Sequence, residues 1–463
     1  MKPTDLAKLN IPSDPRISPH GEAVLFTVSR PNLDDDRYDQ TIWIADANGA
    51  RPFTEGVRDT NPRWSPDATR VAFTRREDDE AKPQVAIIST DGDEVRIVTD
   101  FDRGVEALEW SPDGKRIAVV AVTYVEEWAG LDDDERKRKP RRIKSVPYRF
   151  DNRGWIHNKR RHIWLVDPDG SEDPRCLTPG DYDDELLSWS PDGKRIAFIS
   201  DRDPARGLRS GNDVFEVSVE TGETIQVAPR GFWVQTSYSP SGHLHVLGNT
   251  NPVYPVNSLL YRVEEDGTLT DLTGKLDRNS VSLSAGPPRV AWDGDDAIVG
   301  QEDSGSFGLV RVSPSGLIDE VVTGEQVVTG YDAEEGRVVA TYSTPTSPGE
   351  LYSFEDRTRQ LTHLDTGDVS MVGPDHFTTG SAGHEIDVWV YLPEGEEAVP
   401  LLLNIHGGPA SQYGYGFFDE FQVYVGAGYG VVACNPRGST GKGESFTKAV
   451  TGEGWGAVDL EDV

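Results

Sequence analysis

Short apolar runs alternate with polar turns along the first three quarters of the chain. A turn that begins with Ser-Pro precedes such a run at five places, which start at Ser18, Ser65, Ser111, Ser190 and Ser239. A weaker copy, Trp292-Asp293-Gly294, follows them. Successive serines are 47, 46, 79 and 49 residues apart, which indicates a repeating structural unit of roughly constant length.

A second pattern alternates with the first, and it consists of an alternating apolar strand followed by an Asp/Gly turn. Its seven copies are Ile42–Asp46, Val85–Ile88, Ile163–Asp167, Val214–Val217, Leu260–Val263, Leu309–Val312 and Leu351–Phe354. Four short strands per repeat, with Pro and Gly in the turns, are typical of a β-propeller blade, which buries its apolar faces only against neighbouring blades. A solenoid of this period would show helices or much shorter turns. The sequence therefore predicts an all-β, seven-bladed β-propeller over residues 1–365.

The interval of 79 residues contains an insertion at about residues 124–158. The insertion holds an acidic run, Asp132–Glu135, followed directly by a basic run, Arg136–Lys144. A basic run of this kind can be a nucleic-acid or localisation patch. In so acidic a chain we favour an exposed loop whose basic half pairs with the acidic residues before it.

Near residue 370 the repeat ends, and a different pattern occupies residues 366–463. Asp387–Leu392 alternates as a strand does, whereas Pro400–Ile405 and Gly428–Asn435 are continuous apolar runs suited to a sheet that is covered on both faces. The aromatic segment Gln412–Val425 is predicted to begin a helix between them. This order suits an α/β domain entered by its first strands, and the resemblance described below implies that residues 366–463 are the incomplete, N-terminal part of an α/β-hydrolase domain.

The turn His406-Gly407-Gly408-Pro409 follows a predicted buried strand. Two glycines there allow backbone N–H groups to point into a cleft, which is how an α/β-hydrolase builds half of its oxyanion hole. The alternative is a tight turn beside a histidine of purely structural role.

With these motifs in this order, the chain resembles the prolyl oligopeptidase family of serine peptidases, in its acylaminoacyl-peptidase-like branch. The resemblance rests on the propeller, His406–Pro409, Asn435–Phe446, and Gly454-Trp455-Gly456 leading to Asp459–Val463. It implies that the amide of Gly408 helps to bind the oxyanion of the tetrahedral intermediate. It also implies that the propeller screens the site, so that only short peptides enter.

The catalytic triad of that family is absent from these residues. Its serine lies in a Gly-x-Ser-x-Gly elbow, and that motif does not occur in the 463 residues. Ser439 and Ser445 lack the glycine spacing. From the length of an average helix and strand we expect the elbow about 20–25 residues beyond Val463, with the Asp and His later still. We therefore expect the sequence to be a fragment.

Three further residue groups invite functional readings. Glu126 and Glu127 faintly resemble the paired glutamates with which dipeptidyl peptidases grip a substrate amino terminus, although a solvated acidic surface is the favoured interpretation. Arg437 is predicted to be an ion-pair partner beneath the site, and His406 to hold the turn in place. No other Ser, His and acid combination lies on a strand-to-helix elbow.

The amino-acid composition limits the classes of partner that the protein can bind. Lys plus Arg number 46 and Asp plus Glu number 79, so the formal net charge is −33, which disfavours nucleic acids and anionic membranes. Only 12 of the 46 basic residues are Lys, and this acidic, Lys-poor composition predicts a halophilic protein. Cys176 and Cys434 are expected to be buried free thiols. We predict no metal or other cofactor and, because no apolar leader or spanning segment is evident, a cytoplasmic location.

The sequence thus predicts that the complete protein is a serine peptidase that cleaves short peptides through an acyl-enzyme. It also predicts that the 463 residues are inactive alone. The expected partners are the peptide and the rest of the hydrolase domain, and the sequence leaves open whether the protein forms an oligomer. A non-enzymatic β-propeller used for binding or as a scaffold is the competing hypothesis, but it leaves Ile405–Phe446 unexplained. An esterase or lipase is disfavoured because those enzymes rarely carry a propeller.

Overall fold

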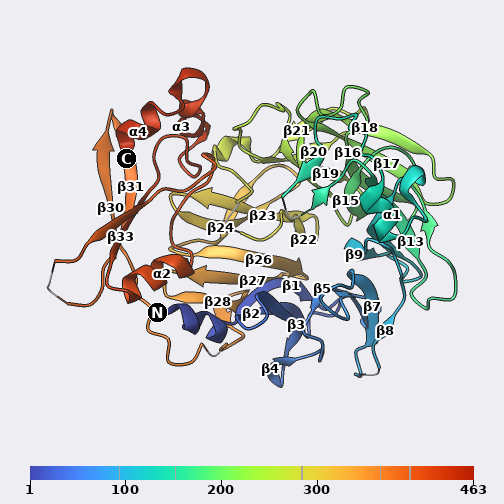
Figure 1. The fold of residues 1–463 in the computed structure, drawn as a ribbon, viewed down its shortest axis with the longest axis horizontal. Helices are drawn as coiled ribbons and strands as arrows, with labels where there is room; N and C mark the ends of the chain where they lie inside the picture. The colour runs from blue at the N-terminus through green and yellow to red at the C-terminus, as the bar shows by residue number, and fades with distance from the viewer. Residues whose placement is uncertain (93, 152, 283–284, 365, 396–397) are drawn as a thin grey trace. The chain divides into compact units, whose positions relative to one another are not determined.

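The computed structural model describes residues 1–92, 94–151, 153–282, 285–364, 366–395 and 398–463. These residues form two compact units. One comprises residues 1–57, 254–260 and 271–463, and the other comprises residues 58–253 and 261–270. Both are built largely of antiparallel strands (Figure 1). The predicted domain boundary at residues 365–366 stays a prediction, since residue 365 lies outside the described residues.

The second unit contains successive antiparallel strand groups and a long strand that serves two of them. Its strands are β5 (Asp59–Trp64), β6 (Arg70–Arg75), β7 (Gln84–Ser89), β8 (Arg96–Ile97), β9 (Val105–Trp110), β10 (Ile117–Tyr124), β13 (Lys159–Val166), β14 (Arg175–Cys176), β15 (Asp184–Trp189), β16 (Arg195–Ser200), β17 (Asn212–Ser218), β18 (Thr224–Tyr238) and β19 (Leu244–Asn249). The first half of β18 pairs with β17 and its second half with β19.

The first unit contains three further groups and the C-terminal region. The strands of these groups are β1 (Ile11–Ile17), β2 (Val24–Asn32), β3 (Arg37–Asp46), β4 (Gly49–Pro52), β22 (Ala291–Asp293), β23 (Asp296–Asp303), β24 (Ser306–Val312), β25 (Ile318–Val322), β26 (Val327–Glu334), β27 (Arg337–Thr344), β28 (Ser347–Phe354) and β29 (Thr358–Gln360). The strands β20 (Leu259–Val263) and β21 (Leu269–Asp271) have residues in both units. Two short 3₁₀ helices are η1 (Pro3–Lys8) and η3 (Gly274–Leu276).

The predicted repeat is confirmed. The seven copies of the second pattern lie in seven strands, which are β3, β7, β13, β17, β20, β24 and β28. Each Ser-Pro turn joins two antiparallel strands, and Trp292-Asp293-Gly294 lies where β22 turns into β23. Each of these groups of four strands contains one such strand, so the described residues form seven such groups.

Strand β10 shows why these strands are apolar on both sides. Ile117 and Val119 belong to a core with residues of β6 and β7, whereas Ala118 and Val120 belong to a core with residues of β15, β16 and β17. Successive side chains of a strand point to opposite faces of its sheet. A sheet packed between two others must therefore be apolar at consecutive positions, and this produces the short apolar runs of the sequence.

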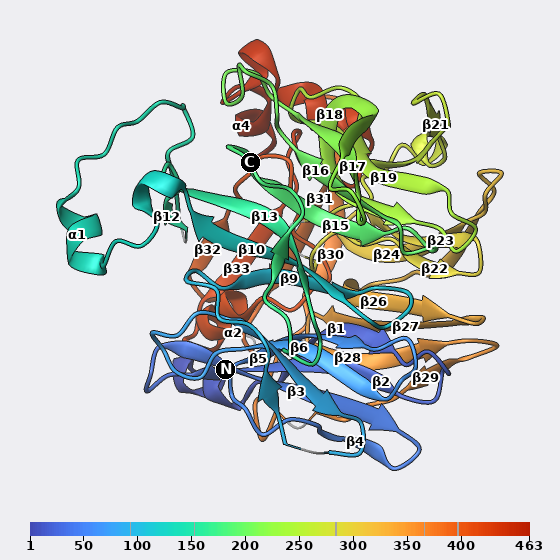
Figure 2. The same ribbon diagram turned by 90° about the vertical axis from the view of Figure 1, so that its right-hand side faces the viewer.

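The predicted insertion is the segment that joins β10 to β13. It carries η2 (Glu126–Trp128), α1 (Asp133–Arg138), β11 (Arg149–Phe150) and β12 (Gly154–Trp155). The segment around α1 projects away from β10 and β13 (Figure 2). Part of the basic run pairs with the acidic run as expected, since Arg136 contacts Asp133 and Lys137 contacts Asp134.

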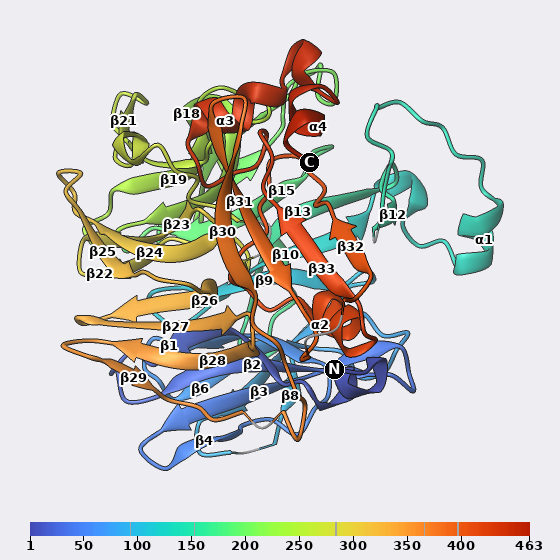
Figure 3. The ribbon, with the colours of Figure 1, turned by 90° about the vertical axis from the view of Figure 1, so that its left-hand side faces the viewer.

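The C-terminal region contains a four-stranded sheet in the order β30-β31-β33-β32 (Figure 3). Its elements are β30 (Asp375–Ser381), β31 (His384–Tyr391), β32 (Leu401–Asn404), α2 (Asp419–Gly426), β33 (Gly430–Cys434), α3 (Glu444–Thr447), η4 (Lys448–Val450), η5 (Gly452–Gly454) and α4 (Val458–Asp462). Strand β32 runs parallel to β33, whereas β31 runs antiparallel to it. Phe421 of α2 packs with Val431 and Ala433 of β33.

Two expectations for this region need correction. Pro400–Ile405 was expected to be covered on both faces, but β32 is an edge strand, and Leu401 and Leu403 are 59% and 50% exposed. The sequence of β32 suits a central strand, but among the described residues it pairs with β33 alone. The helix predicted from Gln412 begins only at Asp419. Before it, Gln412 accepts from the N–H of Gly305 and the N–H of Tyr413 donates to Asn435 Oδ1, and these bonds to other segments replace those of a helix.

The thiols also differ from the expectation in part. Both cysteines are free, but only Cys434 is buried, whereas Cys176 is half-buried on the short strand β14. Burial raises the pKa of the Cys176 thiol to about 11. Among the helices in the described ranges, none is both long enough and apolar enough to span a bilayer.

Candidate functional site

The His406–Pro409 turn lies directly after β32, at the end where the neighbouring parallel strand β33 also finishes. Gly408 has φ +131°, and a Cβ there would lie 2.9 Å from the backbone nitrogen of Ala410. Only glycine fits this position without strain. Gly408 is exposed, and in the described part of the chain its N–H donates no hydrogen bond. The turn therefore presents a backbone donor to solvent.

His406 ties this turn to the loop that follows β33. Its Nδ1 lies 2.9 Å from the carbonyl oxygen of Gly407, and its Nε2 lies 2.9 Å from Oγ of Ser439. A carbonyl can only accept, so Nδ1 carries the proton and Nε2 accepts a hydrogen bond from the Ser439 hydroxyl. Burial lowers the pKa of His406, which favours this neutral form. These contacts support the structural role predicted for His406.

The pairing of His406 with Ser439 was not predicted from the sequence. A signal existed, since both residues follow parallel strands, and the carboxyl ends of adjacent parallel strands meet at one edge of a sheet. Ser439 is 1% exposed and its hydroxyl is held by His406. It also lies in a turn with glycine at 438 and 441, not on a strand-to-helix elbow. Ser439 is therefore unsuited to attack a substrate.

Arg437 forms the ion pair that the sequence predicted. Its Nε lies 2.8 Å from Oδ2 of Asp462, and its Nη2 lies 3.0 Å from Oε2 of Glu461. The backbone N–H of Arg437 also donates to Asp462 Oδ2 at 2.8 Å. Nε and Nη2 of the guanidinium thus hold α4 against the loop after β33.

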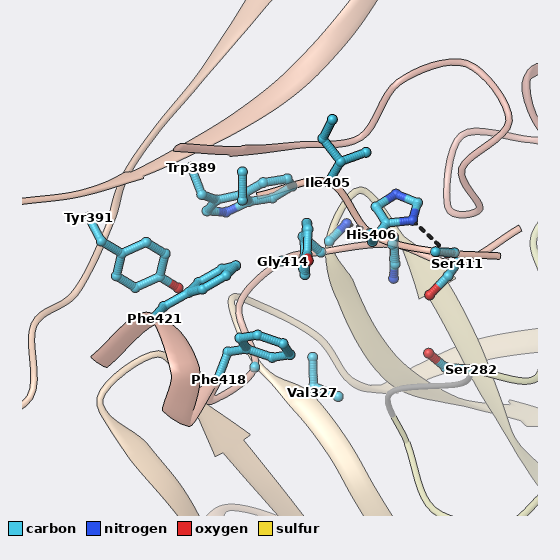
Figure 4. A pocket seen from close by; sticks show the side chains of 16 residues that line it. Ser282, Val327, Trp389, Tyr391, Ile405, His406, Ser411, Gly414, Phe418 and Phe421 are labelled. Atoms are coloured by element: carbon cyan, nitrogen blue, oxygen red, sulfur yellow. Dashed lines mark hydrogen bonds between the residues drawn. The ribbon is translucent and has the colours of Figure 1, made fainter. Parts of the chain in front are cut away.

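A cavity of about 300 Å³ lies beside the turn (Figure 4). One part is aromatic and is formed by Trp389, Tyr391, Tyr413, Phe418 and Phe421. The polar part is formed by Ser282, His406, Ser411 and Gln412. Sequence analysis identified only His406 among these residues, because the others converge from separate strands and loops.

The turn between β23 and β24 holds the loop before α2. The N–H of Gly305 donates to Gln412 Oε1 at 2.9 Å, and Gln412 Nε2 donates to the carbonyl oxygen of Ser306 at 2.9 Å. The N–H of Ser304 donates to the carbonyl oxygen of Gly441 at 3.1 Å. These bonds fix the cavity wall to the loop that carries Ser439.

Glu302, at the end of β23, is buried beneath this junction. It is 1% exposed, and Asn279 Nδ2 donates to its Oε2 at 3.1 Å. Burial raises the pKa of Glu302 to about 7, although hydrogen bonds from neighbouring side chains, Asn279 among them, oppose the shift. Sequence analysis did not identify this residue, because one Glu in an acidic chain gives no sign of burial.

Glu126 and Glu127 lie in the other compact unit, in η2, and both are exposed. Glu127 is 3.5 Å from Lys139. Their role in binding an amino terminus stays a prediction. Across the described ranges, no cluster of three or more His, Cys, Asp or Glu side chains has a geometry that would hold a metal ion.

Sequence and structure comparisons identify relatives along the whole chain. Residues 130–348 match the acylaminoacyl-peptidase N-terminal β-propeller domain, and residues 415–463 match the prolyl oligopeptidase family. The uncharacterized peptidase YuxL of Bacillus subtilis is 33% identical over 99% of this chain and 74% of its own length. Dipeptidyl-peptidase 5 of Porphyromonas endodontalis is 22% identical over 96% of this chain and 68% of its own.

Solved structures show the same fold. The uncomplexed acylaminoacyl peptidase of Pyrococcus horikoshii superposes with a TM-score of 0.80 at 24% identity, covering 96% of this chain and 68% of that one. A puromycin-hydrolyzing peptidase of Mycobacterium tuberculosis superposes with a TM-score of 0.71 at 20% identity, covering 100% of this chain and 72% of that one. With an N-terminal β-propeller followed by part of an α/β-hydrolase domain, this chain belongs to the prolyl oligopeptidase family of serine peptidases.

Proposed function

We propose that this chain supplies the propeller and the oxyanion-binding turn of a peptidase that cleaves short peptides through an acyl-enzyme. The observation that carries the proposal is the exposed, unpaired N–H of Gly408 in a turn held by His406. A donor fixed in this way stabilises the negative charge that develops on the carbonyl oxygen in the transition state. The resemblance noted above assigns the same task to Gly408.

The 463 residues alone are proposed to be inactive. An oxyanion donor without a nucleophile retains only a small part of the rate enhancement of a serine hydrolase. Of the serines near the turn, Ser439 is buried and bound to His406. We therefore propose that the catalytic Ser, Asp and His come from hydrolase residues outside these 463.

The exposed edge strand β32 supports the proposal that further hydrolase residues complete the domain. Leu401, Leu403 and Ile405 are each at least half exposed, although their sequence is that of a buried strand. These side chains alternate along β32 and share one face of the sheet, and within the described ranges the far edge of β32 has no partner strand. An unpaired edge is a template for another strand. We propose that further strands of the hydrolase domain pair with it.

Active-site labelling tests the proposal. The 463-residue chain, and the same chain continued through the codons that follow Val463 in its gene, are treated with a fluorophosphonate serine-hydrolase probe. We expect label only in the continued chain. Robust labelling of the 463-residue chain would show that the nucleophile has been misplaced, and no label in either chain would favour a non-enzymatic binding protein.

The role of Gly408 has its own test in the continued chain, before any probe is added. Alanine keeps the N–H, but a Cβ at residue 408 would lie 2.9 Å from the backbone nitrogen of Ala410 and would displace the turn with its donor. Gly408→Ala should therefore lower kcat for a short peptide nitroanilide by up to about 10²–10³, the loss typical of one oxyanion donor. Gly380→Ala is the matched control, since Gly380 lies in β30 with open space around a Cβ and no positive φ. Equal activity of the two variants would contradict the assignment.

The acidic composition supports a proposal about the environment of the protein. A net charge of −33 with 12 Lys among 46 basic residues fits a protein that stays soluble in concentrated salt. We propose a halophilic, cytoplasmic peptidase.

A further inference from the structure

The basic run of the insertion continues as a basic segment through residue 161, and peptide hydrolysis does not explain this concentration of positive charge. Residues 136–161 contain 12 of the 46 Lys and Arg residues but only one carboxylate, Asp151. The remainder of the chain has 34 basic and 78 acidic residues. Positive charge is therefore concentrated on this one segment of a strongly negative chain.

Ion pairs account for only part of this charge. Arg136, Lys137, Lys139, Arg160 and Arg161 contact carboxylates. Within the described ranges, the cations of this segment without an ion-pair partner are Arg138, Arg141, Arg142, Lys144, Arg149, Arg153 and Lys159. The predicted pairing of the basic run with the acidic run before it is thus incomplete.

Two cations of this segment, Arg136 and Lys159, and a third from outside it, Arg103, surround one aromatic ring at the base of the insertion. Tyr124, the last residue of β10, pairs across the sheet with Lys159, the first residue of β13. The Lys159 ammonium lies 6.0 Å from the ring centre of Tyr124, and the guanidiniums of Arg103 and Arg136 lie 5.9 Å and 4.0 Å from it. The loop with Arg103 is fixed to β10, since Val122 N donates to the carbonyl oxygen of Gly104 at 3.2 Å.

These cations repel one another. Arg103 and Lys159 are half-buried, and in the described part of the chain neither has a carboxylate partner. Burial, followed by the charges of Arg103, Arg153 and Lys82, lowers the pKa of Lys159 to about 8. Gathering unpaired like charges in a partly buried place costs free energy, which a bound anion would offset.

The adjacent glutamates fit the same conclusion. Glu126 and Glu127 follow Tyr124 almost directly, but Glu127 is already paired with Lys139. Arg136 is paired with Asp133, so two cations without an ion pair in the described ranges, Arg103 and Lys159, remain against one unpaired glutamate, Glu126. Local charge at this place therefore favours a negative ligand over a substrate ammonium group.

We propose that Arg103, Tyr124 and Lys159 form a binding site for the carboxylate of a peptide, either an acidic side chain or the C-terminal carboxylate. This inference rests on the proposed function, because a peptidase supplies the peptide. A guanidinium and an ammonium beside an aromatic face suit a planar carboxylate, with one charge-assisted hydrogen bond from each. Peptides with acidic residues would thus be preferred.

Peptide binding to the 463-residue chain tests the site by fluorescence anisotropy. Three dye-labelled peptides of one length are compared: one with Glu and an amidated C-terminus, one with Gln and a free C-terminus, and one with Gln and an amidated C-terminus. We expect one of the first two to bind at least about tenfold more tightly than the third, the effect of one charge-assisted hydrogen bond. Which of the two it is identifies the source of the carboxylate.

Variants locate the site. Lys159→Met and Arg103→Met should each remove this preference, and Lys159→Arg should keep most of it. Lys115→Met is the matched control, since Lys115 is 80% exposed and lies before the opposite end of the same strand β10. Circular dichroism confirms that each variant is folded.

Several results would overturn the inference. They are equal binding of the three peptides, no binding of any of them, or a loss with Lys115→Met as large as with Lys159→Met. Tighter binding of a single-stranded oligonucleotide that is abolished by the same variants would replace the peptide with a nucleic acid. None of these results changes fluorophosphonate labelling, so the proposed peptidase function stands or falls separately.

Discussion

At the scale of single residues, the buried Glu302 leads to the most specific prediction. It is 1% exposed, and no Lys or Arg in the described ranges forms an ion pair with it. Its pKa is raised from 4.5 to about 7. The stability that the protonated Glu302 carboxyl contributes is therefore complete below pH 4.5, and it is lost as the carboxyl ionises with pH rising through about 7. Glu302→Gln should therefore be more stable than the wild type above pH 7, by at most about 3 kcal/mol.

Thermal unfolding at pH 4 to 9 in constant KCl measures this difference. The two proteins should unfold at similar temperatures below pH 4.5 and diverge as pH rises, because glutamine keeps the acceptor for Asn279 without the charge. Glu320→Gln, on the exposed strand β25 of the same sheet, serves as the control and should show no such divergence. A wild type that gains stability relative to Glu302→Gln at high pH contradicts the argument.

At the scale of elements, the Ser-Pro-Asp turns hold the strand pairs. Ser65 Oγ donates to Asp67 Oδ1 at 2.6 Å, and Thr69 donates to the same oxygen through its N–H and its hydroxyl. Ser111 with Asp113 and Ser190 with Asp192 repeat the bond at 2.7 Å. The hydrogen bonds from Ser65 and Thr69 lower the pKa of Asp67 to about 2. The recurring sequence signal is thus a recurring hydrogen-bond network.

Asp67→Ala should lower the free energy of unfolding by about 1 kcal/mol at pH 7, the net value of a hydrogen bond near the surface. Because the pKa of Asp67 is lower in the folded state, its contribution is present above about pH 4 and is lost as pH falls toward 2. Urea unfolding at pH 7, 5 and 3 measures the change, which should shrink at pH 3. Asp91→Ala, at an exposed turn after β7, is the control. A constant difference at all three pH values counts against the network.

The sequence predicts structure correctly where that structure depends on neighbours along the chain. The turn at Ser65, the seven strands and the extent of the insertion follow from local turn chemistry and from alternation along single strands. The prediction fails where burial depends on distant segments. The sequence gives no sign that Glu302 lies under the loop with Ser439, or that β32 lacks a second neighbour. The contact of His406 with Ser439 needed the relative order of β32 and β33.

The exposed strand β32 leads to a prediction for the 463-residue chain. Leu403 is 50% exposed on an unpaired edge, so the chain should self-associate, and more strongly as salt strengthens apolar contacts. Leu403→Glu should lower the mass found by light scattering toward that of a monomer. Leu317→Glu, at a 67% exposed residue in the turn before β25, should leave the mass unchanged. Equal masses for both variants would place the association elsewhere.

At the scale of the whole molecule, the net charge of −33 decides how stability responds to salt. Unscreened carboxylates repel one another more strongly in the compact state than in the unfolded chain, so the unfolding temperature should rise with KCl. The screening length falls from about 10 Å at 0.1 M to about 3 Å at 1 M, so most of the rise should occur below about 1 M. A salt effect on apolar burial would continue to increase beyond that concentration. Repeating the KCl series near pH 4, where many carboxylates are protonated, separates the two causes, because only the screening part should shrink. An unfolding temperature that is flat between 0.1 and 1 M KCl at pH 7 would show that the acidic surface serves solubility alone.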